Sequence, residues 1–184
     1  YLEHGGYQHA LVIGAETLSK MMDWTDRSTC VLFGDGAGAA VLSASKEDGI
    51  LSMVQGSDGF RGDVLNCMAR KVNNPYKKSD TALSYVSMNG QEVYRFAVKT
   101  VPKAVTDAVE QAGLQLEEVD LFLLHQANYR IIEAVSKRLG QPMEKFPTNL
   151  EECGNISAAS VPILLDNVNN HGMMRKGMKL SLIH

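Results

Sequence analysis

The feature that most constrains the fold is the alternation of short apolar segments with longer segments of helical periodicity. Residues 121–124 and 179–183 have the length and apolar character of buried strands. Between them, apolar residues recur at spacings of three or four in segments 131–139 and 161–168, which is typical of amphipathic helices. Buried strands separated by helices form sheets that helices cover on both faces. The sequence therefore predicts an α/β layered fold with a mixed, largely parallel sheet.

A longer helical pattern covers residues 93–112 and contains Pro102. Proline lacks the backbone donor that a helix interior uses, so we expect this helix to be kinked or restarted there. Asn128 is a predicted N-cap for the helix after strand 121–124, and Gly140 is its predicted end. We expect the last helix to open between residues 157 and 162.

The N-terminal region contains a predicted strand at residues 9–13 and two apolar runs, 30–33 and 39–42. The glycine-rich segment 34–38 between these runs could cradle a phosphate if a helix followed it. A strand pattern follows instead, and the glycines are not followed by the Lys-Ser or Lys-Thr pair of a phosphate-binding loop. Because Asp35-Gly36 is a typical turn sequence, we expect a hairpin here.

The middle of the chain is less regular. Residues 50–54 predict a further strand, whereas residues 56–80 show neither helical nor strand periodicity. Loops of that length are uncommon in compact domains and are often functional. Small and charged residues at 43–49 mark the best internal boundary.

Composition excludes several classes of protein. The chain has 184 residues, 45% of them hydrophobic, and a net charge of -3, which suits one globular unit with its own core. No run of basic residues is longer than a pair, which argues against nucleic-acid or membrane-surface binding. No apolar stretch approaches the roughly 20 residues of a membrane-spanning helix. The three cysteines are widely spaced and form no CxxC pair, so we expect no metal site and a reducing, cytoplasmic setting.

His125 and Asn155 are the candidate site residues. His125 follows a buried strand, at the edge where open α/β sheets bind ligands, and the polar turn after it leaves room for one. A histidine in this place could instead merely cap the strand, and Asn155 could be a helix cap. If the imidazole N–H and the Asn155 amide converged on one oxygen, they would form an oxyanion hole.

Four motifs occur in the order found in β-ketoacyl-acyl carrier protein synthase III, which essentially the whole chain resembles. They are Asp-Trp-Thr-Asp-Arg at 23–27, Phe-Gly-Asp-Gly-Ala-Gly at 33–38, His-Gln-Ala-Asn-Tyr-Arg at 125–130 and Gly-Asn-Ile-Ser-Ala-Ala-Ser-Val-Pro at 154–162. The resemblance implies a thiolase-like fold, in which two similar α/β halves stack in five layers, and a homodimer. On this basis residues 1–46 are expected to be the trailing part of the N-terminal half, and residues 47–184 the C-terminal half.

The resemblance also implies a reaction that initiates fatty acid biosynthesis. In that family a cysteine takes an acyl group from acyl-CoA, and a histidine and an asparagine stabilise the enolate formed when malonyl-acyl carrier protein loses carbon dioxide. Matched by motif, these two residues are His125 and Asn155. No cofactor is implied beyond the CoA and acyl carrier protein thioesters, which are substrates.

Binding residues follow from the same motifs. Arg27 resembles the contact to the CoA adenine, and Gly90, Ala127 and Asn128 resemble residues that line the pantetheine channel. A basic patch resembling the one that docks the acidic carrier protein consists of Arg95, Arg130, Lys137 and Arg138. For this patch the alternative is an ordinary solvated helix face.

Two departures from the family pattern lead us to expect a fragment. The family's nucleophilic cysteine lies upstream of the position of Tyr1, and none of Cys30, Cys67 and Cys153 matches it. The family's Gly-rich segment after Leu182 is also missing, and His184 does not match it. Two other interpretations stay open: a non-catalytic half that binds the pantetheine arm or a carrier protein, and a related condensing enzyme of secondary metabolism.

Overall fold

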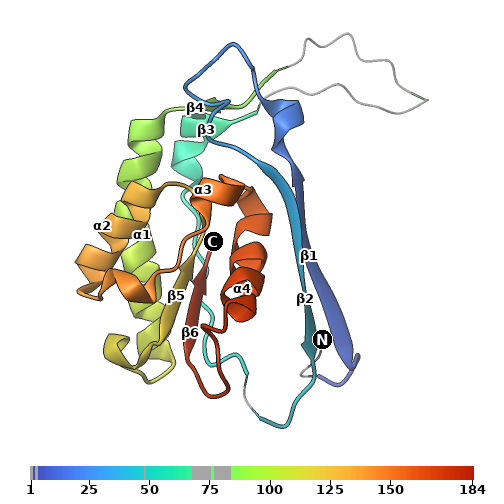
Figure 1. The fold of residues 1–184 in the computed structure, drawn as a ribbon, viewed down its shortest axis with the longest axis vertical. Coiled ribbons are helices and arrows are strands. Elements are labelled where there is room, and N and C mark those ends of the chain that lie inside the picture. Colours follow the sequence, from blue (N-terminus) through green and yellow to red (C-terminus); the bar gives the residue numbers. More distant parts are fainter. Residues whose placement is uncertain (1, 3, 48, 68–75, 77–83) are drawn as a thin grey trace.

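The structure is a computed structural model that describes residues 2, 4–47, 49–67, 76 and 84–184 (Figure 1). The strands are β1 (His9–Thr17), β2 (Asp35–Ser43), β3 (Leu65–Asn66), β4 (Ser87–Met88), β5 (Leu121–Leu124) and β6 (Leu180–Ile183). The α-helices are α1 (Gly90–Gln111), α2 (Tyr129–Leu139), α3 (Leu150–Cys153) and α4 (Ser160–Asn170). Short 3-10 turns occur at Leu18–Met21, Gly59–Val64, Leu116–Glu118, Met143–Lys145 and Ser157–Ala159.

The layers form around β5, which pairs in parallel with β6 and is buried along its whole length. Phe122 and Leu124 face the core that includes Val105 of α1 and Val135 of α2. The alternate residues of β5, Leu121 and Leu123, pack with the buried side chains of α4. Successive side chains of a strand point to opposite faces, so a strand of four apolar residues is covered by helices on both sides. The predicted α/β layered fold is confirmed.

A second sheet lies beyond α4 and consists of β1 and β2 (Figure 1). These strands pair antiparallel over nine positions, from His9 opposite Ser43 to Thr17 opposite Asp35. The small β3–β4 pair is also antiparallel. The described strands form three separate two-stranded sheets, of which only β5–β6 is parallel, so the parallel share is smaller than expected.

The predicted hairpin at residues 34–38 is wrong. Asp35 and Gly36 lie inside β2 and pair with β1, while residues 30–32 form a turn and Phe33 makes only an isolated bridge. A Cβ built on Gly38 would come within 2.9 Å of the Pro162 side chain, and one on Gly36 within 3.1 Å of Ile156. These glycines allow close approach of α4 and the turn before it, so they serve packing and not a turn.

The other helices and strands follow the sequence more closely. Asn128 accepts a hydrogen bond from the Arg130 N–H at 2.8 Å and so caps α2, and Gly140 ends that helix in the left-handed conformation with φ 65°. Helix α4 opens at Ser160, within the predicted interval. Helix α1 runs through Pro102 as one helix, so the predicted restart does not occur, and residues 50–54 form no strand. Part of the irregular segment 56–80 lies outside the described residues.

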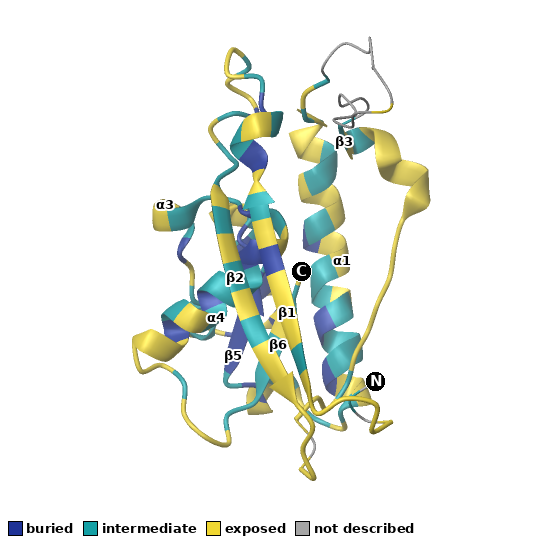
Figure 2. Ribbon diagram, turned by 90° about the vertical axis from the view of Figure 1, so that its right-hand side faces the viewer, coloured by how far each residue is buried: buried dark blue, intermediate teal, exposed yellow. Residues whose placement is uncertain are grey.

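Burial is uneven across the molecule (Figure 2). The core between α1, α2, β5 and α4 is buried, whereas β1 and β2 expose large apolar side chains, with Leu11 62% and Val41 65% exposed. Within the described part of the chain, no helix combines the length and apolar character needed to cross a membrane.

Candidate active site

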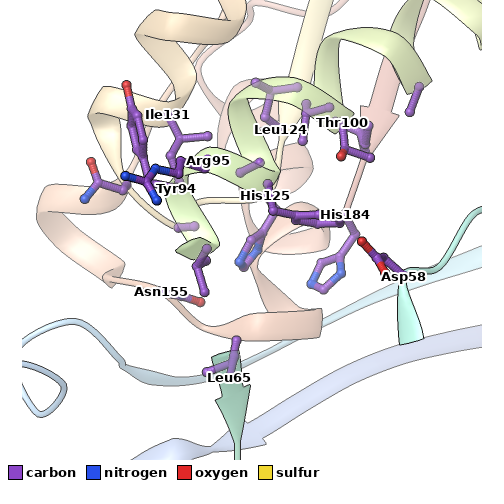
Figure 3. A pocket seen from close by; sticks show the side chains of 18 of the residues that line it. Asp58, Leu65, Tyr94, Arg95, Thr100, Leu124, His125, Ile131, Asn155 and His184 are labelled. Atoms are coloured by element: carbon purple, nitrogen blue, oxygen red, sulfur yellow. The ribbon is translucent and has the colours of Figure 1, made fainter. Parts of the chain in front are cut away.

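A cavity of about 1860 Å³ opens where the carboxyl ends of β5 and β6 meet the first turns of α1 and α2 (Figure 3). Its walls come from segments that are distant in the sequence, including residues 54–58, the first half of α1, and Asn155. Because parallel strands end at the same edge of a sheet, the residues that directly follow β5 and β6 are neighbours there. These residues are His125 and His184, and both line the cavity.

His125 is held on three sides. Its backbone N–H donates to the Ile183 carbonyl at 2.8 Å, which continues the pairing of β5 with β6. Its Nδ1 lies 2.9 Å from the Ser160 hydroxyl, and its ring centroid lies 4.5 Å from that of His184. Burial, with a smaller effect from the charge of His184, lowers the pKa of His125 from 6.5 to about 4. At neutral pH the imidazole is therefore uncharged.

Asn155 is positioned through its backbone. Its N–H donates to the Leu32 carbonyl at 3.0 Å, and its carbonyl accepts from the Gly34 N–H at 2.8 Å, which forms an isolated parallel bridge at Phe33. A Cβ at Gly34 would lie 2.4 Å from the Cys153 carbonyl oxygen, so only glycine permits this approach. The glycine-rich motif at residues 33–38 thus holds the Asn155 motif at residues 154–162 in place.

The Asn155 side chain has a defined orientation. Its Oδ1 accepts a hydrogen bond from the Ser157 N–H at 3.0 Å. A backbone N–H can only donate, so the carbonyl oxygen of the amide must face Ser157, and the Nδ2 group is left for another acceptor. Asn155 and His125 come from two different segments of the chain and both line the cavity, as Figure 3 shows.

The turn after His125 divides into inward and outward residues. Gln126 is fully buried, donates to the Leu124 carbonyl at 2.8 Å and accepts from the Asn149 N–H at 3.2 Å. It therefore anchors the turn to the core and offers nothing to a ligand. Ala127 and Asn128 line the cavity, as does Gly90 at the start of α1.

The predicted basic residues separate into two groups. Arg95 and Arg130 line the cavity, although Arg95 is also paired with Glu92. Lys137 and Arg138 are exposed in the last turn of α2 and do not line it; Lys137 lies 2.7 Å from Glu133, which raises the pKa of that lysine. Arg27 is exposed outside the cavity lining, which includes its neighbour Ser28.

Two residues at the site were missed by sequence reasoning. His184 could have been found, because it follows a strand predicted to run parallel to the one that precedes His125. Ser160 carried no local signal, since its contact to His125 joins residues 35 positions apart. Across the described ranges, no three His, Cys, Asp or Glu side chains are placed to hold a metal ion together.

Fold and site together define the chain as part of a thiolase-like α/β protein with a histidine–asparagine pair at the edge of its sheet. Two family models match it: "3-Oxoacyl-[acyl-carrier-protein (ACP)] synthase III" over residues 1–59, and the C-terminal model of the same synthase over residues 109–183. The chain belongs to the 3-oxoacyl-acyl carrier protein synthase III family.

Relatives and solved structures agree with this assignment. The chain is 45% identical over 184 residues to beta-ketoacyl-[acyl-carrier-protein] synthase III of Clostridium acetobutylicum, and 49% identical over 183 residues to that of Clostridium kluyveri. Each alignment covers 100% of this chain and 57% of the relative, so the chain spans a little over half the length of these curated relatives.

Among solved structures, 3-oxoacyl-(acyl carrier protein) synthase III (FabH) from Pseudomonas aeruginosa PAO1 matches with a TM-score of 0.89 at 36% identity. That match covers 98% of this chain and 55% of the other. The priming beta-ketosynthase of the R1128 polyketide biosynthetic pathway matches with a TM-score of 0.88, also at 36% identity, over 98% of this chain and 54% of the other.

Proposed function

We propose that this chain supplies the histidine and asparagine of a β-ketoacyl-acyl carrier protein synthase III, an acyltransferase that initiates fatty acid biosynthesis. The reaction is a decarboxylative Claisen condensation of an acyl-CoA primer with malonyl-acyl carrier protein. The observation that carries the proposal is the pairing of an uncharged imidazole with an amide whose Oδ1 is already occupied, both at one cavity.

The proposed chemistry has two stages. A cysteine thiolate first displaces CoA from the acyl thioester, which divides a difficult reaction into two easier ones. The malonyl group then loses carbon dioxide, and the electron pair of the broken C–C bond forms an enolate. Asn155 Nδ2 and an N–H of His125 donate to the enolate oxygen, its carbon attacks the acyl thioester, and the cysteine leaves as thiolate.

The nucleophile is proposed to come from outside these 184 residues. Cys30, Cys67 and Cys153 are all described by the structure, and none of them is among the residues that line the cavity. The extra length of the relatives leaves ample chain for such a segment. This proposal makes the described chain alone inactive in condensation.

The rest of the cavity suits a long, flexible thioester arm. Gly90, Ala127 and Asn128 lie on its wall and are proposed to contact pantetheine. Arg27, which precedes the cavity-lining residue Ser28, is proposed to contact the CoA adenine. Arg130 at the cavity wall, together with Arg95, Lys137 and Arg138, is proposed to attract the acidic carrier protein. The ion pairs of Arg95 and Lys137 weaken their share of this attraction, which leaves more of it to Arg130 and Arg138.

The test is Asn155→Ala in the full-length enzyme. Loss of one oxyanion donor typically costs 10²–10³ in rate, about 3–4 kcal/mol. We expect malonyl decarboxylation to fall by this factor, while acylation of the cysteine by acyl-CoA stays unchanged. Asn170→Ala, at the exposed end of α4, is the matched control. Decarboxylation that survived in Asn155→Ala would refute the assigned role.

A second candidate is a non-catalytic half that binds the pantetheine arm or a carrier protein. The absence of a cysteine from the described cavity wall favours it for the chain alone. Incubation of the 184-residue chain with radiolabelled acyl-CoA distinguishes a catalytic chain from a non-catalytic binding half, because a stable covalent adduct would show that a nucleophile is present. A third candidate is a condensing enzyme with other starter groups. It is favoured because the polyketide priming ketosynthase is as similar to this chain, at 36% identity, as the synthase from Pseudomonas aeruginosa.

The setting of the enzyme is part of the proposal. We place it in the cytoplasm, as a homodimer that needs no cofactor beyond its thioester substrates. The exposed apolar side chains of β1 and β2 support further protein covering this sheet. Size-exclusion chromatography with light scattering on the full-length enzyme tests the dimer.

A further inference from the structure

Ser160 lies at the start of α4, is 2% exposed, and makes two side-chain contacts that have different chemical requirements. Its Oγ lies 2.7 Å from the Ser157 carbonyl oxygen and 2.9 Å from His125 Nδ1. A carbonyl oxygen can only accept, and a serine hydroxyl has one proton to donate. The two contacts therefore cannot both be made by donation from Ser160.

Only one arrangement makes both contacts hydrogen bonds. The Ser160 proton points to the Ser157 carbonyl, and the second bond is donated by His125 through a proton on Nδ1. The opposite arrangement, with the Ser160 proton on the side of Nδ1, would leave two acceptor oxygens facing each other at 2.7 Å. In a buried place, such an unsatisfied pair is costly.

We propose that Ser160 is a positioning residue that fixes the unliganded His125 in its Nδ1–H tautomer, so that Nε2 carries a lone pair. The tautomer of a neutral histidine is set by the hydrogen bond of its other ring nitrogen, which is the role given to Ser160. Burial lowers the pKa of His125 to about 4, so the imidazole is uncharged at neutral pH and carries one proton, on either Nδ1 or Nε2.

The catalytic consequence rests on the proposed function. An enolate oxygen needs a donor at His125, whereas the resting Nε2 is an acceptor. The donor form is the costly arrangement described above, in which the Ser160 hydroxyl faces Nδ1 and gives up the Ser157 carbonyl. The Nδ1 proton then goes to solvent and Nε2 gains one from solvent, so the hydrogen bond from Nε2 to the enolate oxygen must offset that cost. The same serine then supports the donor tautomer. Ser160 thus specifies an acceptor before the negative charge forms and supports a donor afterwards.

The tautomer is tested by nitrogen-15 NMR of the 184-residue chain at neutral pH, with labelled histidine. The chain contains five histidines, and His125→Gln identifies the signals of His125 by their loss. We expect the shift of a protonated ring nitrogen at Nδ1 and of an unprotonated one at Nε2. A protonated Nε2 in the unmodified chain would overturn the proposal, whatever the variants do.

Ser160→Ala and Ser160→Thr separate positioning from packing. Ser160→Ala is expected to move both His125 shifts toward the Nε2–H pattern, whereas Ser160→Thr keeps a hydroxyl and retains the resting pattern. Ser157→Ala is the matched control, because it preserves the carbonyl that accepts the Ser160 proton. Unchanged shifts in Ser160→Ala would overturn the role of Ser160. These signals do not depend on enzyme activity, so they can stand or fall separately from the decarboxylation test of Asn155→Ala.

Discussion

His125 should make the stability of the chain sensitive to mild acid. Burial and the nearby His184 lower its pKa from 6.5 to about 4 in the folded chain, so between these values the unfolded chain binds the proton more tightly. The stability that the uncharged His125 allows is fully present above pH 6.5, and the free energy of unfolding decreases as the pH falls toward 4. For pKa values of 6.5 and about 4, linkage predicts a loss of about 2 kcal/mol between pH 8 and pH 5.

The assay is urea unfolding of the chain and of His125→Gln at pH 8 and pH 5. Other titrating groups act in both proteins, so the quantity of interest is the difference in free energy of unfolding between the two proteins. The advantage of the unmodified chain over His125→Gln should shrink by about 2 kcal/mol from pH 8 to pH 5. His171→Gln, at an exposed position beyond α4, should keep the full acid sensitivity of the unmodified chain.

His184→Gln tests the second cause of the shift. Removal of the His184 charge should raise the pKa of His125 part of the way toward 6.5 and reduce the acid sensitivity, while the larger effect of burial remains. If the unmodified chain and His125→Gln lost the same stability from pH 8 to pH 5, the buried, uncharged histidine inferred here would be refuted.

Three further predictions concern stability and are checked by urea unfolding at pH 8. Gln126→Ala removes two buried hydrogen bonds and should cost about 3 kcal/mol. Gly14→Ala would place a methyl group 2.5 Å from the Ala158 carbonyl oxygen and should cost about 1–3 kcal/mol, whereas Gly49→Ala meets nothing within 4 Å and should be neutral. Asn128→Ala removes the cap of α2 and should cost about 1 kcal/mol, whereas Asn128→Ser keeps a capping oxygen and should retain most of the stability. Equal stability of the two glycine variants would contradict the close packing inferred for β1.

The elements with a clear local signal could be predicted from the sequence. The apolar run of β5, the helical spacing in α2 and α4, and the cap at Asn128 all depend on residues within a few positions of each other. His125 was predicted directly after a buried strand and Asn155 just before a helix, and the structure has both residues there. The glycines of β2 misled the prediction, because a glycine that permits close packing and a glycine that permits a turn look the same in sequence.

The amino-acid sequence by itself determined the α/β class, the main helices and buried strands, and the two residues at the centre of the candidate site. Only the tertiary structure decided that Gly34 clamps Asn155, that Ser160 contacts His125, and that the pKa of His125 falls to about 4. The reason is physical. Helical and strand periodicity arises from neighbours along the chain, whereas desolvation and hydrogen-bond geometry depend on atoms that meet only when distant segments pack together.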